Sequence, residues 1–178
     1  MRQTIAFIPG SFSVPHSGHW NMISYYAGKA DYVIVLVSAP KKAIRRVQGG
    51  SVELSPEKSK AILDVFLARS GLKNVKVLVS GQPSPVRAAM KMISGLTGCR
   101  VIIGQSDKDV KRYGWVPGCF HNRDDLSFAD LVYHAVDSVS ASDIRKDISD
   151  FGKYKAVLPD FLSGGDIAAI RSIISKSK

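Results

Sequence analysis

The sequence contains too few cysteines for a fold that depends on disulfide bonds. Cys99 and Cys119 are the only two in 178 residues, and they are not clustered as zinc ligands are. Two separated cysteines therefore exclude a disulfide framework and give no sign of a structural zinc site. We expect the protein to work in a reducing cytoplasm.

Long hydrophobic runs are also missing. No apolar stretch approaches the roughly 20 residues that a membrane-spanning helix needs. The apolar run at 5–8 is far too short for the core of a secretory signal peptide. We expect a soluble protein that neither spans nor enters a membrane. The chain shows no internal repeat and no low-complexity tract.

Acidic residues are scarce relative to basic ones. The chain has 25 Lys and Arg against 15 Asp and Glu, a formal net charge of +10. This excess favours an anionic partner, which could be a nucleotide, a phosphorylated metabolite or a nucleic acid. Aromatic residues interleaved with basic ones, as on many RNA-binding surfaces, are absent, so nucleic acid is the less favoured partner.

The hydrophobic content of 45% is enough for one packed core. We expect a single domain over 1–178, with a core at 4–150 and a C-terminal helical segment at 151–178. Apolar runs and turn residues predict strands that alternate with helices. The predicted strands cover 4–8, 32–37, 75–79, 100–103 and 131–136. The predicted helices cover 20–27, 56–70, 85–94, 138–149 and 166–174.

Several helix ends have clear local signals. Ser55 followed by Pro56 is a typical start, and the sequence at Ser84 repeats it. Gly71 is expected to end the helix that begins at Pro56, and Gly28 is expected at the C′ position of the first helix. The polar, glycine-containing stretch at 105–125 is predicted to be a long functional loop.

Strands that alternate with helices imply a parallel α/β sheet with helices on both faces. Ligands bind such sheets at the carboxyl ends of the strands. The loops after Ile8, Val37, Ile103 and Val136 should therefore lie on one rim.

The most informative stretch begins where the first strand ends, at Gly10. It delivers His16 and His19 around Gly18, at the start of the first helix. Unpaired backbone N–H groups and the positive helix end make such a junction a site for phosphate. Two histidines there could donate hydrogen bonds to the same anion.

The segment 10–19, Gly-Ser-Phe-Ser-Val-Pro-His-Ser-Gly-His, resembles the signature of the nucleotidylyltransferase superfamily, Gly-Thr/Ser-Phe-Asp-Pro-x-His-x-Gly-His. Ser13 stands where Asp is common, and Val14-Pro15 inverts the usual Pro-x. The alternative is a pair of histidines with no ligand. The strand before the motif and the helix after it favour the functional interpretation.

A second segment, Val-Ser-Ala-Ser-Asp-Ile-Arg at 139–145, resembles the C-terminal Ile-Ser-Ser-Thr-x-Ile-Arg motif of that family. Ser140 and Ser142 could cap a helix whose N–H groups face a phosphate, and Arg145 would add a charge-assisted contact. An ordinary capped surface helix is the alternative for this segment alone. The presence of both motifs in one α/β chain favours the family resemblance.

Two further loops are similar to family segments. Lys42 lies in a basic loop that resembles the phosphate-binding loop after the second strand. Gly104 and Asp107 lie in a segment similar to the Gly-Ser-Asp segment that lines the nucleotide. The alternatives are a solvated basic loop and a polar turn.

The resemblance implies a Rossmann-like, doubly wound sheet of about five parallel strands and an adenylyltransferase activity. Such enzymes transfer AMP from ATP to a phosphate-bearing acceptor and release pyrophosphate, with Mg²⁺ held mainly by the substrate and no metal site of the protein. The residues implied in catalysis are His16, His19, Lys42 and Arg145. The residues implied in nucleotide binding are Gly10, Ser11, Phe12, Gly18, Gly104, Asp107, Ser140, Ser142 and Ile144.

The acceptor is less constrained by the sequence than the nucleotide. The form of the second motif resembles that of adenylyltransferases, with nicotinamide mononucleotide as the first candidate acceptor. Phosphopantetheine, a flavin and a cytidylyl acceptor stay open. A non-catalytic nucleotide-binding or RNA-binding protein with the same fold is the alternative from another class, and a homo-oligomer is compatible with the sequence.

Overall fold

The computed structural model describes residues 2–38, 54–135 and 150–175. Several predicted features lie outside these ranges: Lys42, Ser140, Ser142, Ile144, Arg145 and the helix expected at 138–149.

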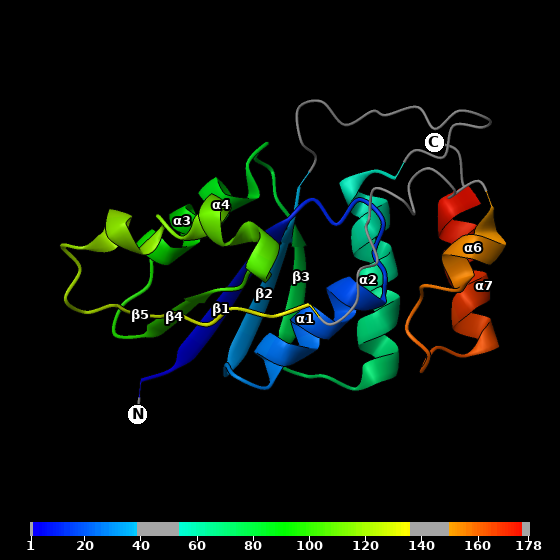
Figure 1. Ribbon diagram of the computed structural model, residues 1–178, viewed down its shortest axis with the longest axis horizontal. Helices are drawn as coiled ribbons and strands as arrows, with labels where there is room; N and C mark the ends of the chain where they lie inside the picture. The colour runs from blue at the N-terminus through cyan, green and yellow to red at the C-terminus, as the bar shows by residue number, and fades with distance from the viewer. Residues whose placement is uncertain (1, 39–53, 136–149, 176–178) are drawn as a thin grey trace.

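Five parallel strands form one sheet and confirm the predicted fold class (Figure 1). They are β1 (Thr4–Gly10), β2 (Tyr32–Val37), β3 (Val75–Val79), β4 (Arg100–Ile103) and β5 (Ser127–Ala129). Their order across the sheet is β3-β2-β1-β4-β5. Phe7 of β1 lies opposite Ile34 of β2 and Ile103 of β4. The chain crosses back over β1 after β3, which puts the topological switch point between β1 and β4.

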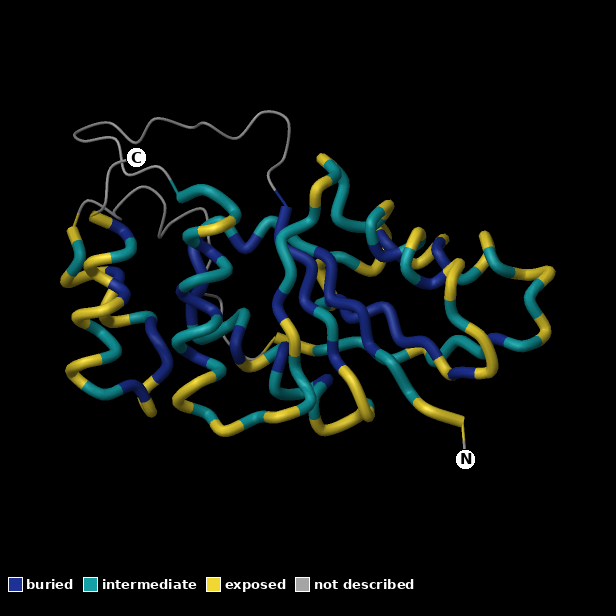
Figure 2. The backbone as a smooth tube through the Cα atoms, turned by 180° about the vertical axis from the view of Figure 1, so that it is seen from behind, coloured by how far each residue is buried: buried dark blue, intermediate teal, exposed yellow. Residues whose placement is uncertain are grey.

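Helices cover both faces of the sheet. They are α1 (Ser17–Ala27), α2 (Pro56–Ser70), α3 (Pro85–Ser94), α4 (Val110–Tyr113), α6 (Phe151–Lys155) and α7 (Gly164–Ser175), with 3-10 turns η1 (Asp107–Asp109) and η2 (Pro117–Phe120). Successive side chains of a strand point to opposite faces. Ile8 packs in the core with α1, α2 and α7, and Phe7 packs in the core with α3 and α4. The central strands are accordingly the most deeply buried part of the chain (Figure 2).

The local helix signals are confirmed at α2. The Ser55 side chain accepts a hydrogen bond from the Lys58 N–H at 3.3 Å, and Pro56 occupies the first turn. Gly71 ends the helix in the left-handed conformation, with φ 74°. Gly28 ends α1 as predicted, with φ −80° in the right-handed region.

The strand predicted at 131–136 is wrong. The fifth strand is Ser127–Ala129, three residues long, and it pairs with β4. Within 131–135, only Tyr133 forms an isolated bridge, with Ser106. The carbonyl of Leu131 accepts a hydrogen bond from the Tyr26 hydroxyl instead of a strand partner. The apolar run at 131–136 placed the strand too late, because pairing with β4 decides which residues form the strand.

The stretch 105–125 is not the long irregular loop that its composition predicts. It folds into η1, α4 and η2. Tyr113 and Val116 are buried against the α3 side of the sheet. Short helical turns of this kind depend on tertiary burial of a few apolar side chains, which residue composition does not reveal.

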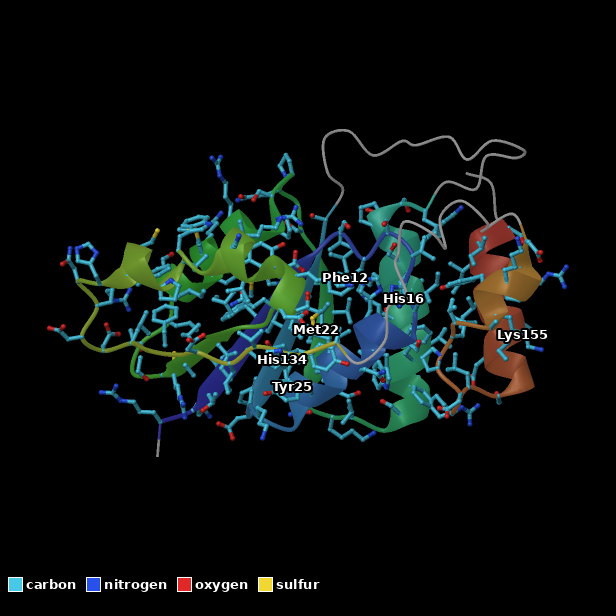
Figure 3. All side chains as sticks on the ribbon, viewed as in Figure 1. Phe12, His16, Met22, Tyr25, His134 and Lys155 are labelled. Atoms are coloured by element: carbon cyan, nitrogen blue, oxygen red, sulfur yellow. The ribbon has the colours of Figure 1, made fainter. Side chains whose placement is uncertain are left out.

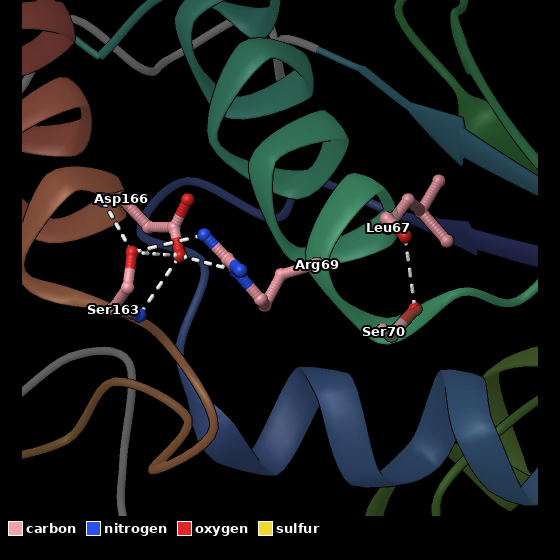
Figure 4. A network of polar contacts seen from close by, with 5 residues as sticks. All are labelled: Leu67, Arg69, Ser70, Ser163 and Asp166. Carbon is pink, nitrogen blue, oxygen red and sulfur yellow. Dashed lines mark hydrogen bonds and ion pairs between the residues drawn. The ribbon is translucent and has the colours of Figure 1, made fainter.

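The C-terminal helix is confirmed, and it docks on α2. Ser163 and Asp166 lie at its start, and the Asp166 carboxylate accepts a hydrogen bond from Arg69 of α2 at 2.7 Å (Figure 4). Ile170 and Ile174 are the buried residues of α7. No helix in the described parts of the chain is long and apolar enough to cross a membrane.

Candidate active site

The candidate site lies at the carboxyl end of β1, beside the topological switch point. Gly10 ends β1 and Ser17 begins α1, so six residues connect strand to helix, from Ser11 to His16. Figure 3 shows Phe12 and His16 at this junction. This is the position at which open α/β sheets bind their ligands.

Phe12 determines the shape of the connecting loop. Its φ of 43° is the only positive value at a non-glycine residue in the described parts of the chain. Its side chain is buried and folds back over Gly10, where a Cβ atom would lie 2.8 Å from Phe12 Cε2. Gly10 is therefore required by this close approach. Ser11 lies between the two and is half-buried.

His16 is buried and forms the N-cap of α1. Its backbone is extended, and its Nδ1 accepts a hydrogen bond from the Gly18 N–H at 3.1 Å. Because Nδ1 is an acceptor, the neutral ring carries its proton on Nε2. Burial lowers the pKa of His16 from 6.5 to about 4. The ring is therefore neutral at pH 7, and Nε2–H is the donor that it can offer.

Gly18 allows the ring of His16 to lie against the helix start. A Cβ atom at Gly18 would be 2.9 Å from Cε1 and 3.1 Å from Nδ1 of His16. Carbon atoms do not approach so closely without displacement of the ring. Gly18 therefore fixes the position of the His16 ring, through its N–H and through its lack of a side chain.

The structure brings the two predicted histidines together. The ring centroids of His16 and His19 are 4.0 Å apart, with an angle of 38° between the ring planes. Phe12 packs against His19, and the centroids of these two rings are 5.1 Å apart. Two imidazoles and a phenyl ring therefore form one small aromatic group at the N-terminal end of α1, where backbone N–H groups are free of intrahelical acceptors.

The predicted nucleotide segment after β4 is also at this edge of the sheet. Gly104 donates its N–H to the Phe7 carbonyl at 2.7 Å, which keeps it beside β1. Asp107 is exposed; its carboxylate accepts a hydrogen bond from the Lys108 N–H at 3.0 Å and lies 3.9 Å from His134 Nδ1. Gly104 is therefore next to the switch point, while the Asp107 side chain is engaged locally in η1.

Tyr26 is a residue of this region that the sequence motifs did not indicate. Its hydroxyl is buried and accepts from the Gln105 N–H at 3.0 Å, and its one proton is shared between the Gln105 carbonyl at 2.8 Å and the Leu131 carbonyl at 3.0 Å. Burial raises the pKa of Tyr26, so the hydroxyl stays neutral. Tyr26 lies on α1, and its hydroxyl contacts Gln105 just after β4. The two residues are 79 positions apart in the sequence, so no local motif indicates this contact.

Gln105 is a second residue that was missed. It is buried, and its Oε1 has no hydrogen-bond partner among the described residues. A buried amide oxygen without a donor costs free energy, and this one follows β4 at the carboxyl edge of the sheet. Its polar character in a strand-end position was visible in the sequence, but its burial was not.

The described residues offer no group of three or more His, Cys, Asp or Glu side chains that could hold a metal ion. Lys42, Ser140, Ser142, Ile144 and Arg145 lie outside the described ranges, so their positions relative to the histidines stay predictions. Gly10, Ser11, Phe12, His16, Gly18 and His19 are brought together by the loop described above.

No family model and no curated protein matches the sequence. Solved structures do match. A bifunctional NMN adenylyltransferase/ADP ribose pyrophosphatase from Francisella tularensis superposes with a TM-score of 0.60 at 13% identity, over 99% of this chain and 51% of that one. The present chain thus spans about half the length of that enzyme.

Two other structures are similar to the chain. A protein from Vibrio parahaemolyticus assigned as a nicotinate-nucleotide adenylyltransferase gives a TM-score of 0.55 at 12% identity, over 95% of this chain and 99% of that one. The NadR protein in complex with NR gives 0.56 at 17% identity, over 88% and 43%. The predicted resemblance to the nucleotidylyltransferases is therefore confirmed at the level of the fold: this chain has the Rossmann-like α/β fold of those nucleotide adenylyltransferases.

Proposed function

We propose that the protein is a nucleotidylyltransferase that transfers AMP from ATP to a phosphate-bearing acceptor. The observation that carries the proposal is the His16–His19 pair, 4.0 Å apart at the start of α1 and at the carboxyl end of β1. Phosphate oxygens need several donors that converge from one side. Two imidazoles at the positive, N-terminal end of a helix supply donors of this kind.

In this proposal the acceptor phosphate attacks the α-phosphorus of ATP directly. A P–O bond to the acceptor forms, the bond to the β-phosphate oxygen breaks, and pyrophosphate leaves. No protein nucleophile is required, so the protein acts through positioning and through donors aimed at the charge that develops on the phosphate oxygens. The Nε2–H of neutral His16 and the ring of His19 would contact the α- and β-phosphates.

The remaining predicted residues complete the proposed site. Ser140, Ser142 and Arg145 would contact the β- and γ-phosphates, Lys42 would neutralise the triphosphate or the acceptor, and Ile144 would line the nucleotide. Gly104 and Asp107 would line the same nucleotide from the end of β4. In this proposal Mg²⁺ is held mainly by the substrate oxygens.

Nicotinamide mononucleotide is the first candidate acceptor. The form of the second motif supports it, and so do the names of the structural neighbours, which act on NMN or nicotinate nucleotide or bind NR. Phosphopantetheine and a cytidylyl acceptor are the alternatives. In the proposal, the histidine pair would contact the phosphates of the nucleotide in the same way with each of these acceptors.

The experiment that tests the proposal is pyrophosphate release from ATP or CTP with a panel of acceptors. The panel contains nicotinamide mononucleotide, phosphopantetheine, FMN and glycerol 3-phosphate. We expect release with ATP and nicotinamide mononucleotide, and its loss in a His19→Ala variant that is still folded by circular dichroism. Absence of release with every pair would contradict the proposal.

A binding protein without catalysis is the second candidate, and the net charge of +10 is the observation that favours it. It predicts no pyrophosphate release but measurable affinity for a nucleotide or for RNA. RNA affinity that falls steeply with salt would identify the nucleic-acid form of this candidate, because counterion release scales with the phosphates contacted.

A further inference from the structure

The loop that carries His16 is held from the C-terminal segment at two points. The Tyr154 hydroxyl of α6 donates a hydrogen bond to the Pro15 carbonyl at 2.6 Å. The Ser17 N–H donates to the Val157 carbonyl at 2.8 Å. These two bonds lie on either side of His16 in the chain, and both partners come from α6 and the turn that follows it.

The bond from Tyr154 is a buried one. The side chain has 1% of its surface exposed and belongs to the main core on the α1 side of the sheet. Burial raises the pKa of its hydroxyl, so the group stays a neutral donor over the usual pH range. A buried hydroxyl that lost its acceptor would not be compensated by water. Tyr154 and Pro15 therefore hold each other in a fixed position.

The C-terminal segment is itself firmly attached to the rest of the protein. Asp150 caps α6 by accepting from the Gly152 N–H at 3.0 Å. Phe161 packs against Trp20 of α1, with ring centroids 5.4 Å apart. Farther on, α7 is tied to α2 by Arg69 and Asp166. The segment can therefore act as a fixed support for the loop, because its contacts with α1 and α2 do not depend on the loop.

We infer that Tyr154 is a positioning residue for His16: by holding the Pro15 carbonyl it keeps the backbone at the N-cap of α1 in the extended form that directs the ring onto Gly18. His16 has φ −145° and ψ 177°, and in this extended conformation its Nδ1 accepts a hydrogen bond from the Gly18 N–H at 3.1 Å. This role in placing the imidazole ring does not depend on what reaction the protein catalyses. Its effect on turnover rests on the proposed function.

Loss of the Tyr154 hydroxyl has a specific consequence for His16. The loop would gain freedom at Pro15, water would reach the imidazole, and the desolvation that lowers its pKa would weaken. The pKa of His16 should then rise from about 4 toward the ordinary value of 6.5. A residue that only stabilises the fold would not change the pKa of one histidine while the protein remains folded.

The test compares Tyr154→Phe with Asp166→Asn. The first removes one hydroxyl and keeps the ring. The second loosens the same C-terminal segment at α7, away from the histidine loop. The pKa of His16 is measured by NMR titration of labelled imidazoles on the full chain, and kcat and KM are measured with ATP and the active acceptor.

For Tyr154→Phe we expect the pKa of His16 to rise by about one unit or more and kcat to fall about tenfold, the factor that corresponds to one hydrogen bond. Asp166→Asn should leave both unchanged. An unaltered His16 pKa in Tyr154→Phe, or the same rise in both variants, would overturn the inference. If no acceptor supports turnover but the His16 pKa still rises, the positioning role stands and the proposed function fails.

A second variant keeps the test decisive if Tyr154→Phe folds poorly. Ser17→Pro removes the N–H that bonds to the Val157 carbonyl. Proline is well tolerated at the first residue of a helix, and the extended His16 before it is compatible with a following proline. The variant should raise the pKa of His16 in the same direction. No change in the pKa of His16 in this folded variant would contradict the inference.

Discussion

His16 and Gly18 are joined by a hydrogen bond in which the imidazole Nδ1 accepts from the backbone N–H at 3.1 Å. The bond selects the neutral tautomer with its proton on Nε2, which leaves Nε2–H as the donor of this ring. A histidine that is both buried and oriented in this way is a fixed donor and not a variable charge.

The stability of the protein should fall as the pH decreases from 6.5 to about 4. The pKa of His16 is about 4 in the folded protein and 6.5 when unfolded, so between these values the unfolded chain binds a proton that the folded chain does not. The loss should reach up to about 3 kcal/mol near pH 4. Urea denaturation across this range measures it. A His16→Gln variant should show a smaller slope, and an equal slope would contradict the prediction.

Gly18→Ala should destabilise the protein by about 1–3 kcal/mol, the usual cost of overpacking. The new methyl group would lie 2.9 Å from His16 Cε1 and would displace the ring. Gly28→Ala is the matched control. Its φ is −80° and the nearest atom to a Cβ is 3.6 Å away, so the variant should be as stable as the parent or slightly more so. Equal stability of the two variants in urea would contradict the packing argument.

His19→Ala should lower turnover by about 10²- to 10³-fold, as expected for loss of one donor to the transition state. The ring packs between Phe12 and His16, so the folded state is checked separately by thermal denaturation. Steady-state pyrophosphate release is the measurement. A folded variant with nearly parental turnover would remove His19 from the proposed mechanism.

Tyr26→Phe should reduce the free energy of unfolding by about 1–3 kcal/mol, because the buried Gln105 N–H would lose its acceptor. Tyr113→Phe is the control, since this tyrosine is also buried but forms no hydrogen bond through its hydroxyl within the described residues. Its loss of stability should be smaller. Chemical denaturation of both variants gives the comparison, and equal losses would refute the assigned role of the Tyr26 hydroxyl.

Gln105→Met should increase the free energy of unfolding by about 1 kcal/mol. The replacement has a similar length and removes an amide oxygen that no described residue satisfies. Gln105→Glu should lower the free energy of unfolding, because it places an ionisable carboxyl group at a buried position. The melting temperatures of the two variants provide the measurement. A destabilised Met variant would show that the amide contributes favourable contacts.

The accuracy of the sequence-based fold prediction depended on how local each signal was. Ser55, Pro56 and Gly71 delimit α2 through bonds within the helix itself, and the predicted bounds are confirmed. The fifth strand depends on a distant partner: the Ser127 N–H bonds to the Cys99 carbonyl in the neighbouring strand. The apolar run at 131–136 carried no information about that partner, so the predicted strand was wrong.

The candidate site divides in the same way. The motif at 10–19 was sufficient to predict a histidine pair at a helix start, because the strand, the turn and the helix are contiguous in the chain. The sequence did not indicate that His16 is buried and neutral, since these properties depend on side chains packed from other elements. Nor did it indicate the role of Tyr26 at the end of β4.

Local patterns of apolar, capping and glycine residues in the sequence determined the order of strands and helices and the contiguous junction of β1 with α1. The support of that junction was decided by the tertiary structure. Tyr154 and Pro15 are 139 positions apart and meet only because α6 packs against the start of α1. Such a contact comes from the burial of side chains brought together from distant parts of the chain, and no local pattern contains it.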